Sequence, residues 1–358
     1  MKKQRRSRLR KVGLPPGTLI HVGDVKTSQP QVCLFRYDAL QLAETSAPVL
    51  EGLDLQPPET GILWLNVHGL QNATLMAEIG RAFNLHPLTL EDILNTDQRP
   101  KLDSFDHYLY FVARFFSYDA ASKNITSEQV SIVLGQNFVL SFQERPTGSF
   151  ELVRERLRAD KGHIRKSGAD YLTYALLDMI VDRYFIVLEQ IGDDCEALED
   201  ELLRKSTPLV LQNIHQLKRE TMELRRAVWP LREALNALTR NESGYFQAGT
   251  LLYLRDVYDH TVHFIESLES LRDLLGGMLD IYLSSISNRV NMEVRALTVV
   301  AMLFMPATLI AGVFGMNFKI MPLLQNPDGF WIAMGMMAGI AGVMGMIFWR
   351  RQWLSRRA

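Results

Sequence analysis

A line of side chains near the C-terminus has the residue types and the spacing to border the path of an ion. Its members follow one another by three or four residues, as on one face of a helix, and change from acidic to polar to apolar. They are Asp280, Ser284, Ser287, Asn291, Val294, Leu297, Ala301, Met305, Thr308 and Gly312. Rings of polar side chains and apolar constrictions are the parts from which channels are built. Any helix that enters a membrane shows a similar change of polarity, so the spacing alone leaves both interpretations open.

Two uncharged runs indicate which elements position these residues. Residues 296–316 and residues 329–349 each contain 21 residues without a charge, enough to span a hydrocarbon core of ~30 Å. Soluble proteins rarely join two such runs by only 12 residues. We therefore predict two transmembrane helices with a connector, residues 317–328, between them. In the second run, Gly335, Gly339, Gly342 and Gly345 form a smooth face for close helix packing.

Arginine residues on either side of the two runs predict the orientation. Arg289 and Arg295 precede the first run, and a basic C-terminal tail, residues 350–358, follows the second. The arginines of this tail are Arg350, Arg351, Arg356 and Arg357. Because positive charges remain on the cytoplasmic side, we expect both termini in the cytoplasm and the connector outside. A two-helix hairpin encloses no pore by itself, so it is either an anchor or one member of a ring of several copies.

For the region before the first run, residues 161–295, we predict a helical stalk. An acidic helical hairpin is expected at about 170–241, with Gly192 and Pro208 interrupting it. A longer helix is expected from about residue 251, because no proline follows until Pro306. Its apolar residues recur at coiled-coil-like spacing, and the Gly276-Gly277 pair is a weak point in it.

Residues 17–160 predict an α/β domain that ends at the polar segment 161–168. Apolar and aromatic runs predict strands at 17–24, 31–37, 61–70, 106–119, 127–135 and 137–144. Helical spacing predicts helices at 72–85 and 86–95. A hairpin turn is expected at 135–137.

The net charge of −1 hides a segregation of charge. The first 11 residues carry seven Lys or Arg, the last nine carry four, and the body between them has a charge of −12. The basic N-terminal tail, residues 1–16, has no apolar run behind it and is not a signal peptide. The acidic body argues against nucleic acid as a partner, and no common catalytic motif predicts an enzyme. Cys33 and Cys195 are too far apart in sequence to suggest a disulfide or zinc framework.

Several motifs, in order along residues 13–354, resemble the CorA-type magnesium transporter family. The most specific is FGMNF at 314–318, directly after an apolar helix and followed by MP at 321–322. The others are HPLTLEDILNTDQRPK at 86–101, WPLRE at 229–233, RDVYDHT at 255–261 and LDIYLSSISN at 279–288. The resemblance implies a homopentameric funnel in the cytoplasmic (inner) membrane that takes up Mg²⁺, with Co²⁺ or Ni²⁺ as further ions. It also implies a cytoplasmic α/β domain, a long helical stalk and a two-helix transmembrane hairpin in each copy.

The resemblance assigns roles to individual residues of the ion path. Gly315, Met316 and Asn317 would form the selectivity filter, with Asn317 ringing the outer mouth. Asn291 and Asp280 would form rings at the cytoplasmic entrance. The family's hydrophobic gate matches Leu297, Ala301 and Met305.

The resemblance also implies Mg²⁺ sensor sites between neighbouring subunits. Asp92 and Asp256 are the matching carboxylates, and Glu91 and Asp178 are auxiliary ligands. A bound ion would hold the closed state, and its loss would free the subunits to open. The C-terminal arginines match a basic collar near the inner mouth of the pore.

This sequence departs from the family pattern at three positions near the filter. Phe314 replaces the usual Tyr, and Lys319 and Leu323 stand where relatives carry acidic residues, so we expect weaker attraction of cations. Two alternatives remain: a zinc-transporting member of the same superfamily, and a non-conducting coiled-coil sensor or scaffold anchored in the membrane.

Overall fold

The computed structural model describes residues 13–146, 148–242, 244–317, 319, 321–323 and 326–351. The chain divides into two compact units, and the boundary in the sequence falls between Gly277 and Met278. This boundary lies directly after the Gly276-Gly277 pair. The first 12 residues of the basic N-terminal tail, together with Arg356 and Arg357, lie outside the described residues.

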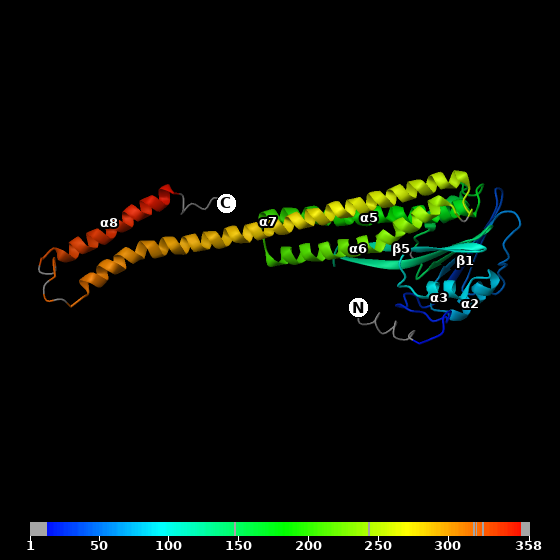
Figure 1. Ribbon diagram of the computed structural model, residues 1–358, viewed down its shortest axis with the longest axis horizontal. Helices are drawn as coiled ribbons and strands as arrows, with labels where there is room; N and C mark the ends of the chain where they lie inside the picture. The colour runs from blue at the N-terminus through cyan, green and yellow to red at the C-terminus, as the bar shows by residue number, and fades with distance from the viewer. Residues whose placement is uncertain are drawn as a thin grey trace. The chain divides into compact units, whose positions relative to one another are not determined.

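The first unit is built on a seven-stranded sheet (Figure 1) with the strand order β2-β1-β3-β7-β6-β5-β4. Neighbouring strands are antiparallel except β3 and β7, which are parallel. The strands are β1 (Gln31–Tyr37), β2 (Leu42–Ala47), β3 (Ile62–His68), β4 (Lys101–Phe105), β5 (Tyr108–Asp119), β6 (Asn124–Leu134) and β7 (Phe138–Gln143). The tight connection between β6 and β7, in which Gly135 donates its N–H to Phe138, confirms the predicted hairpin.

One face of the sheet is covered by two short helices, α2 (Ala73–Ala82) and α3 (Pro87–Leu94). Their apolar sides join alternate strand residues in one buried core, because side chains of a strand point to opposite faces in turn. The core includes Leu34, Leu65, Met76, Ile79, Ile93, Tyr110 and Leu140. Asn72 caps α2 by accepting N–H groups of Thr74 and Leu75, and His86 caps α3 ahead of Pro87. The core therefore fixes the helix that carries Glu91 and Asp92.

The opposite face of the sheet lies against the long helix α5 (Ala169–Arg204), with the short helix α4 (Glu151–Arg158) beside it. Trp64 stacks on Phe35 with ring centroids 4.9 Å apart and meets Phe150, the residue before α4, at 6.4 Å. Phe115 lies 5.4 Å from the same Phe150 ring. These contacts make the aromatic residues of β1, β3 and β5 the second core of the unit.

His68, at the end of β3, is a buried titratable group on this second face. Its side chain is 3% exposed, and its Nε2 lies 3.1 Å from Gln143 Oε1 on β7. Burial and the positive charge of Arg154 on α4 lower the pKa of His68 to about 4, although the hydrogen bond that the imidazole donates to Gln143 opposes the shift. The imidazole is therefore neutral near pH 7.

Acid is expected to weaken this domain through His68. The unfolded chain binds the proton near pH 6.5 and the folded chain only near 4. Stability is therefore full above pH 6.5 and falls as the pH drops toward 4, by up to about 3 kcal/mol. His68→Gln keeps a neutral polar side chain, so the free energy of unfolding should change less between pH 6.5 and 4 in this variant than in wild type. The measurement is hydrogen exchange of the full-length protein in detergent. His107→Gln, at an exposed histidine, is the control, and equal profiles for His68→Gln and wild type would contradict the assignment.

Long helices follow the sheet. They are α5 (Ala169–Arg204), α6 (Pro208–Arg240), α7 (Ala248–Phe314) and α8 (Gly329–Arg350). Thr207 caps α6 by accepting the N–H of Val210, and Pro208 occupies its first turn. The expected interruption at Gly192 is wrong, because this glycine lies inside α5. One glycine costs a helix only about 1 kcal/mol, and burial of Ile191 and Cys195 beside it outweighs that.

The structure differs from the sequence-based prediction most at the edges of the sheet. The predicted strand at 17–24 forms only an isolated bridge between Val22 and Asn95. Strands β2 and β4, which were not predicted, are the two edge strands. Their sequences, LAETSA and KLDSF, have little apolar alternation, because neither strand contributes a fully buried residue and both are held by backbone pairing on one side. Helix α4, likewise unpredicted, is short and strongly charged.

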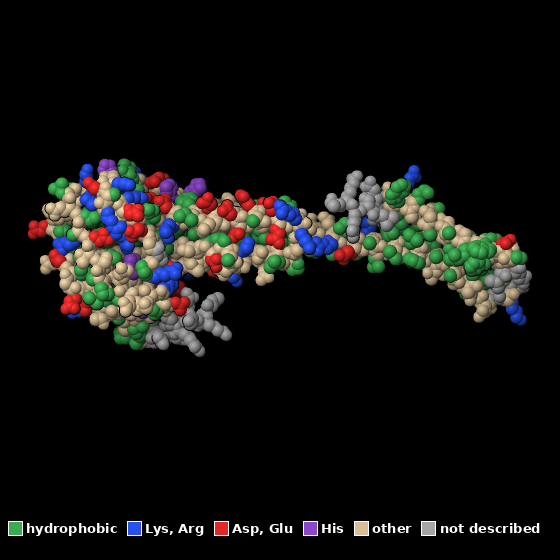
Figure 2. Space-filling view, turned by 180° about the vertical axis from the view of Figure 1, so that it is seen from behind, with side chains coloured by type: hydrophobic (Ala, Val, Ile, Leu, Met, Phe, Trp, Pro, Cys, Tyr) green, Lys and Arg blue, Asp and Glu red, His purple; other side chains and the backbone are tan. Residues whose placement is uncertain are grey.

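The second unit contains the end of α7 and all of α8, and both helices are long and apolar enough to cross a membrane. Helix α7 is 67 residues long and contains Pro306 in its interior. It begins three residues before the predicted start and ends at Phe314, so the prediction of one long helix running into the first apolar run is confirmed. Figure 2 shows many hydrophobic and few charged side chains on the surface of this unit, whereas acidic and basic side chains are frequent on the first.

Candidate ion pathway and cation site

The three residues predicted to form the filter, Gly315, Met316 and Asn317, directly follow α7. Gly315 and Met316 donate their N–H groups to Ala311 and Val313, at 2.9 and 3.2 Å, so the backbone continues the last turn of the helix before it departs. A Cβ atom on Gly315 would lie 3.1 Å from the carbonyl oxygen of Ala311, which is tighter than ordinary contact. Met316 and Asn317 are exposed. The chain thus places Asn317 directly beyond the last turn of α7.

The predicted line of pore residues is a continuously exposed face of α7. Its members are Asp280, Ser284, Ser287, Asn291, Val294, Leu297, Ala301, Met305 and Thr308, all exposed in the single chain. Leu297 is 71% and Met305 70% exposed, whereas Val299 between them is 5% exposed. The hydroxyl of Thr308 donates to the carbonyl of Phe304 at 2.9 Å, so its hydrogen-bonding need is met within the helix. An apolar face of this kind needs lipid or other protein chains to cover it.

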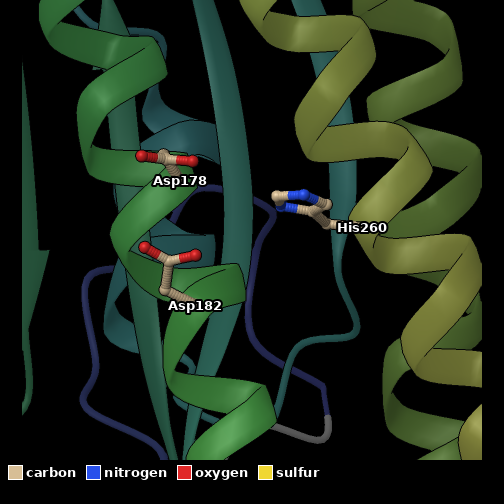
Figure 3. Close-up of side chains that lie close together, drawn as sticks. All are labelled: Asp178, Asp182 and His260. Carbon is tan, nitrogen blue, oxygen red and sulfur yellow. The ribbon is translucent and has the colours of Figure 1, made fainter.

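A second group of functional side chains gathers between α5 and α7 in the first unit. Asp178 and Asp182 come from α5 and His260 from α7, and Figure 3 shows the three pointing toward one another. One possible ligand atom from each lies within 4.8 Å of the others. Asp256, one turn before His260, has its Oδ1 3.9 Å from His260 Nε2. The predicted ligands Asp178 and Asp256 are therefore brought to one place.

The electrostatics of this cluster favour a bound cation. Burial and the neighbouring charge of Asp182 raise the pKa of Asp178 to about 6, although Arg156 and His260 pull it down. A raised carboxyl pKa means that the ionised form lacks sufficient positive partners. Carboxylate oxygens suit Mg²⁺, and an imidazole nitrogen suits Co²⁺ and Ni²⁺. The residues present thus fit a divalent cation, which would supply the missing positive charge.

Asp182 and His260 were missed from the sequence. Asp178 and Asp182, and likewise Asp256 and His260, stand four residues apart on helices. This spacing places the members of each pair on one face. The spacing was visible in the sequence, but the meeting of the two faces depends on how α5 packs against α7.

The other two predicted ligands, Asp92 and Glu91 on α3, have different partners. Lys101 Nζ lies 2.7 Å from one oxygen of Asp92, and Gln98 donates to the other. Glu91 accepts the N–H of Gly17 at 2.5 Å. Among the described residues, the cluster on α5 and α7 contains neither of them.

Only part of the predicted basic collar is described. Arg350 is the last residue of α8, and Arg351 follows it and donates its N–H to Ile347 at 2.9 Å. Both side chains are exposed. Arg356 and Arg357 lie outside the described residues.

An α/β domain, a 67-residue helix and two apolar helices, with carboxylates gathered for a cation, define a membrane protein that handles metal ions. The family model described as "CorA-like Mg2+ transporter protein" matches residues 59–351, and the chain belongs to this family.

Individual relatives match nearly the whole chain. The cobalt/magnesium transport protein CorA of Thermotoga maritima is 41% identical over 344 residues, which is 96% of this chain and 98% of that protein. The protein of the same name from Methanocaldococcus jannaschii is 24% identical over 82% of this chain and 92% of its own length. The solved structure of the complete Methanocaldococcus jannaschii CorA magnesium transporter has a TM-score of 0.77 at 21% identity and covers 91% of this chain and 99% of that one. The last comparison confirms the predicted fold.

Proposed function

We propose that this protein takes up Mg²⁺, with Co²⁺ and Ni²⁺ as further cargo, through a pore formed by five copies of α7. The observation that carries the proposal is the GMN sequence, Gly315 to Asn317, placed directly beyond a 67-residue helix in a chain 41% identical to a cobalt/magnesium transport protein. The membrane is the cytoplasmic membrane, and both termini lie in the cytoplasm, as the flanking arginines indicate.

The proposed filter acts through the hydration shell of the ion. Mg²⁺ gives up its water reluctantly. Neutral amide oxygens from Asn317 of each copy accept hydrogen bonds from that water without binding the ion too tightly to leave. The exposed position of Asn317 past the last turn of α7 supports this role.

The proposed regulation uses the cytoplasmic carboxylates. Asp92 and Glu91 of one copy face Asp178 and Asp256 of the next, and cytosolic Mg²⁺ between them holds the closed state. Like charges facing one another repel unless a cation bridges them. The raised pKa of Asp178 supports the proposal, since this carboxylate needs additional positive charge. Loss of the ion lets the subunits move and opens the apolar constriction at Leu297, Ala301 and Met305.

Ion flux tests the proposed transport. The full-length protein is reconstituted in liposomes that contain a Mg²⁺-sensitive dye, and an external Mg²⁺ step should produce influx above that of protein-free liposomes. Influx of Zn²⁺ in place of Mg²⁺ would favour the zinc-transporting alternative, which the names of the two relatives do not favour. An absence of flux for both ions would favour a non-conducting membrane-anchored sensor or scaffold.

Proteolysis tests the proposed regulation. We expect Mg²⁺ to slow cleavage of the cytoplasmic domain in the wild type, and Asp256→Lys to reduce this response because a fixed cation then occupies the site. The Asp256 side chain is 65% exposed, so the change should not prevent folding. Asp273→Lys makes the same charge change at a 70% exposed position on the same helix and serves as the control. Equal protection of Asp256→Lys and wild type would rule out Asp256 as a ligand.

A further inference from the structure

The carboxylate of Asp92 already has a cation beside it, the ammonium group of Lys101. Lys101 is the first residue of β4, and its Nζ lies 2.7 Å from Asp92 Oδ2. The same ammonium forms a second ion pair with Asp103 and lies 5.6 Å from the centre of the Tyr110 ring. Two carboxylates and an aromatic face are a favourable environment for a positive charge.

The surroundings hold Asp92 in this arrangement. Gln98 donates its side-chain amide to the second carboxylate oxygen of Asp92. Gln129 donates to the backbone carbonyl of Asp92 at 3.0 Å and accepts the N–H of Gln98 at 3.1 Å. Gln129 itself is fully buried. Both oxygens of Asp92 are thus engaged by side chains that a buried residue keeps in position.

A divalent ion at Asp92 must meet this ammonium. The Lys101 side chain is only 33% exposed and is held on three sides, so it does not swing away without breaking its second ion pair. Two cations a few ångströms apart repel each other, and partial burial weakens the screening by water. A divalent ion that binds Asp92 must therefore either displace the ammonium group of Lys101 or bind beside it, and repulsion weakens binding in the second case.

We propose that Lys101 is a built-in competitor of the divalent cation at Asp92 and raises the Mg²⁺ concentration at which the regulatory site fills. The inference rests on the proposed regulatory function. Its consequence is that the sensor responds to high cytosolic Mg²⁺ and stays empty at low Mg²⁺, although its carboxylates alone would bind more tightly. Lys101 acts here as a positioning and affinity-setting residue and not as a ligand.

A Mg²⁺ titration of the full-length protein in lipid nanodiscs tests the proposal, with protection from proteolysis as the readout. Lys101→Gln removes the charge but keeps a donor for Asp92, and we expect its midpoint to fall about fivefold or more below that of wild type. Lys101→Arg restores a cation and should return the midpoint to within about twofold of wild type. Lys123→Gln, which removes another lysine paired with a carboxylate, Asp194, should leave the midpoint unchanged.

The outcomes separate the two ideas. If Mg²⁺ does not protect the wild type at any concentration, the proposed regulation fails and the inference falls with it. If the wild type is protected but Lys101→Gln has the same or a higher midpoint, the inference alone is overturned. Should Lys101→Gln fail to fold, Asp103→Asn is used. This substitution removes the second ion-pair partner of Lys101, so that the ammonium pairs with Asp92 alone. The Mg²⁺ midpoint should then rise. An unchanged or lower midpoint would equally overturn the inference.

Discussion

Asn317→Ala is expected to reduce Mg²⁺ influx into liposomes at least about tenfold, a loss of ~1.4 kcal/mol or more in the barrier to entry. The substitution removes the amide oxygen that each copy offers to the hydrated ion. The backbone of the filter should persist, because Gly315 and Met316 keep their hydrogen bonds to the last turn of α7. The measurement is the initial rate of dye fluorescence at equal amounts of reconstituted protein.

Asn326→Ala is the matched control for this loss of flux. Asn326 is an exposed asparagine in the same connector, and its side chain accepts a long hydrogen bond, 3.3 Å, from the N–H of Asp328. We expect this variant to conduct at nearly the wild-type rate. If Asn317→Ala conducts as well as Asn326→Ala, the filter does not lie at Asn317.

Trp64→Ala is expected to destabilise the first unit by about 3–5 kcal/mol. The side chain is fully buried, its ring stacks on Phe35, and its Nε1 donates to the hydroxyl of Ser141 at 2.9 Å. Truncation leaves a large cavity and removes the donor to Ser141 in a site without access to water. The loss is a large part of the ordinary stability of a domain, about 5–15 kcal/mol.

The measurement for Trp64→Ala is urea unfolding of the full-length protein in detergent, followed by hydrogen exchange in the strands β1, β3 and β7. Trp229→Ala is the control, because Trp229 is 40% exposed and lies between the guanidinium groups of Arg225 and Arg232. Its loss should cost about 1 kcal/mol. A cost for Trp64→Ala no greater than that for Trp229→Ala would contradict the packing of this core.

Elements with strong local signals were predictable. The strands β1, β3, β5, β6 and β7 each contain a buried apolar or aromatic run, and the two apolar helices exceed the length that a soluble domain requires. Pro208 after Thr207 marks the start of α6 in the sequence itself. Elements that owe their structure to a partner were not predictable. The edge strands β2 and β4 carry mostly polar side chains, and backbone pairing with β1 and β5 makes them strands.

The candidate sites follow the same division. The GMN sequence and the carboxylates of α3, α5 and α7 could be named from the chain, because residue type and motif carry that information. The partners of those carboxylates could not, since they are set by packing. Asp182 and His260 join Asp178 only because α5 lies against α7, and Lys101 reaches Asp92 only because the connection at 95–100 brings the start of β4 back beside α3.

The sequence by itself thus determined that this protein has two apolar runs long enough to span a membrane, a long helix followed by GMN and an N-terminal part rich in carboxylates. These features depend on composition and on contacts between neighbours in the chain. The tertiary structure alone decided which charges meet, because electrostatic interactions depend on distances and burial that arise only when separate elements pack together.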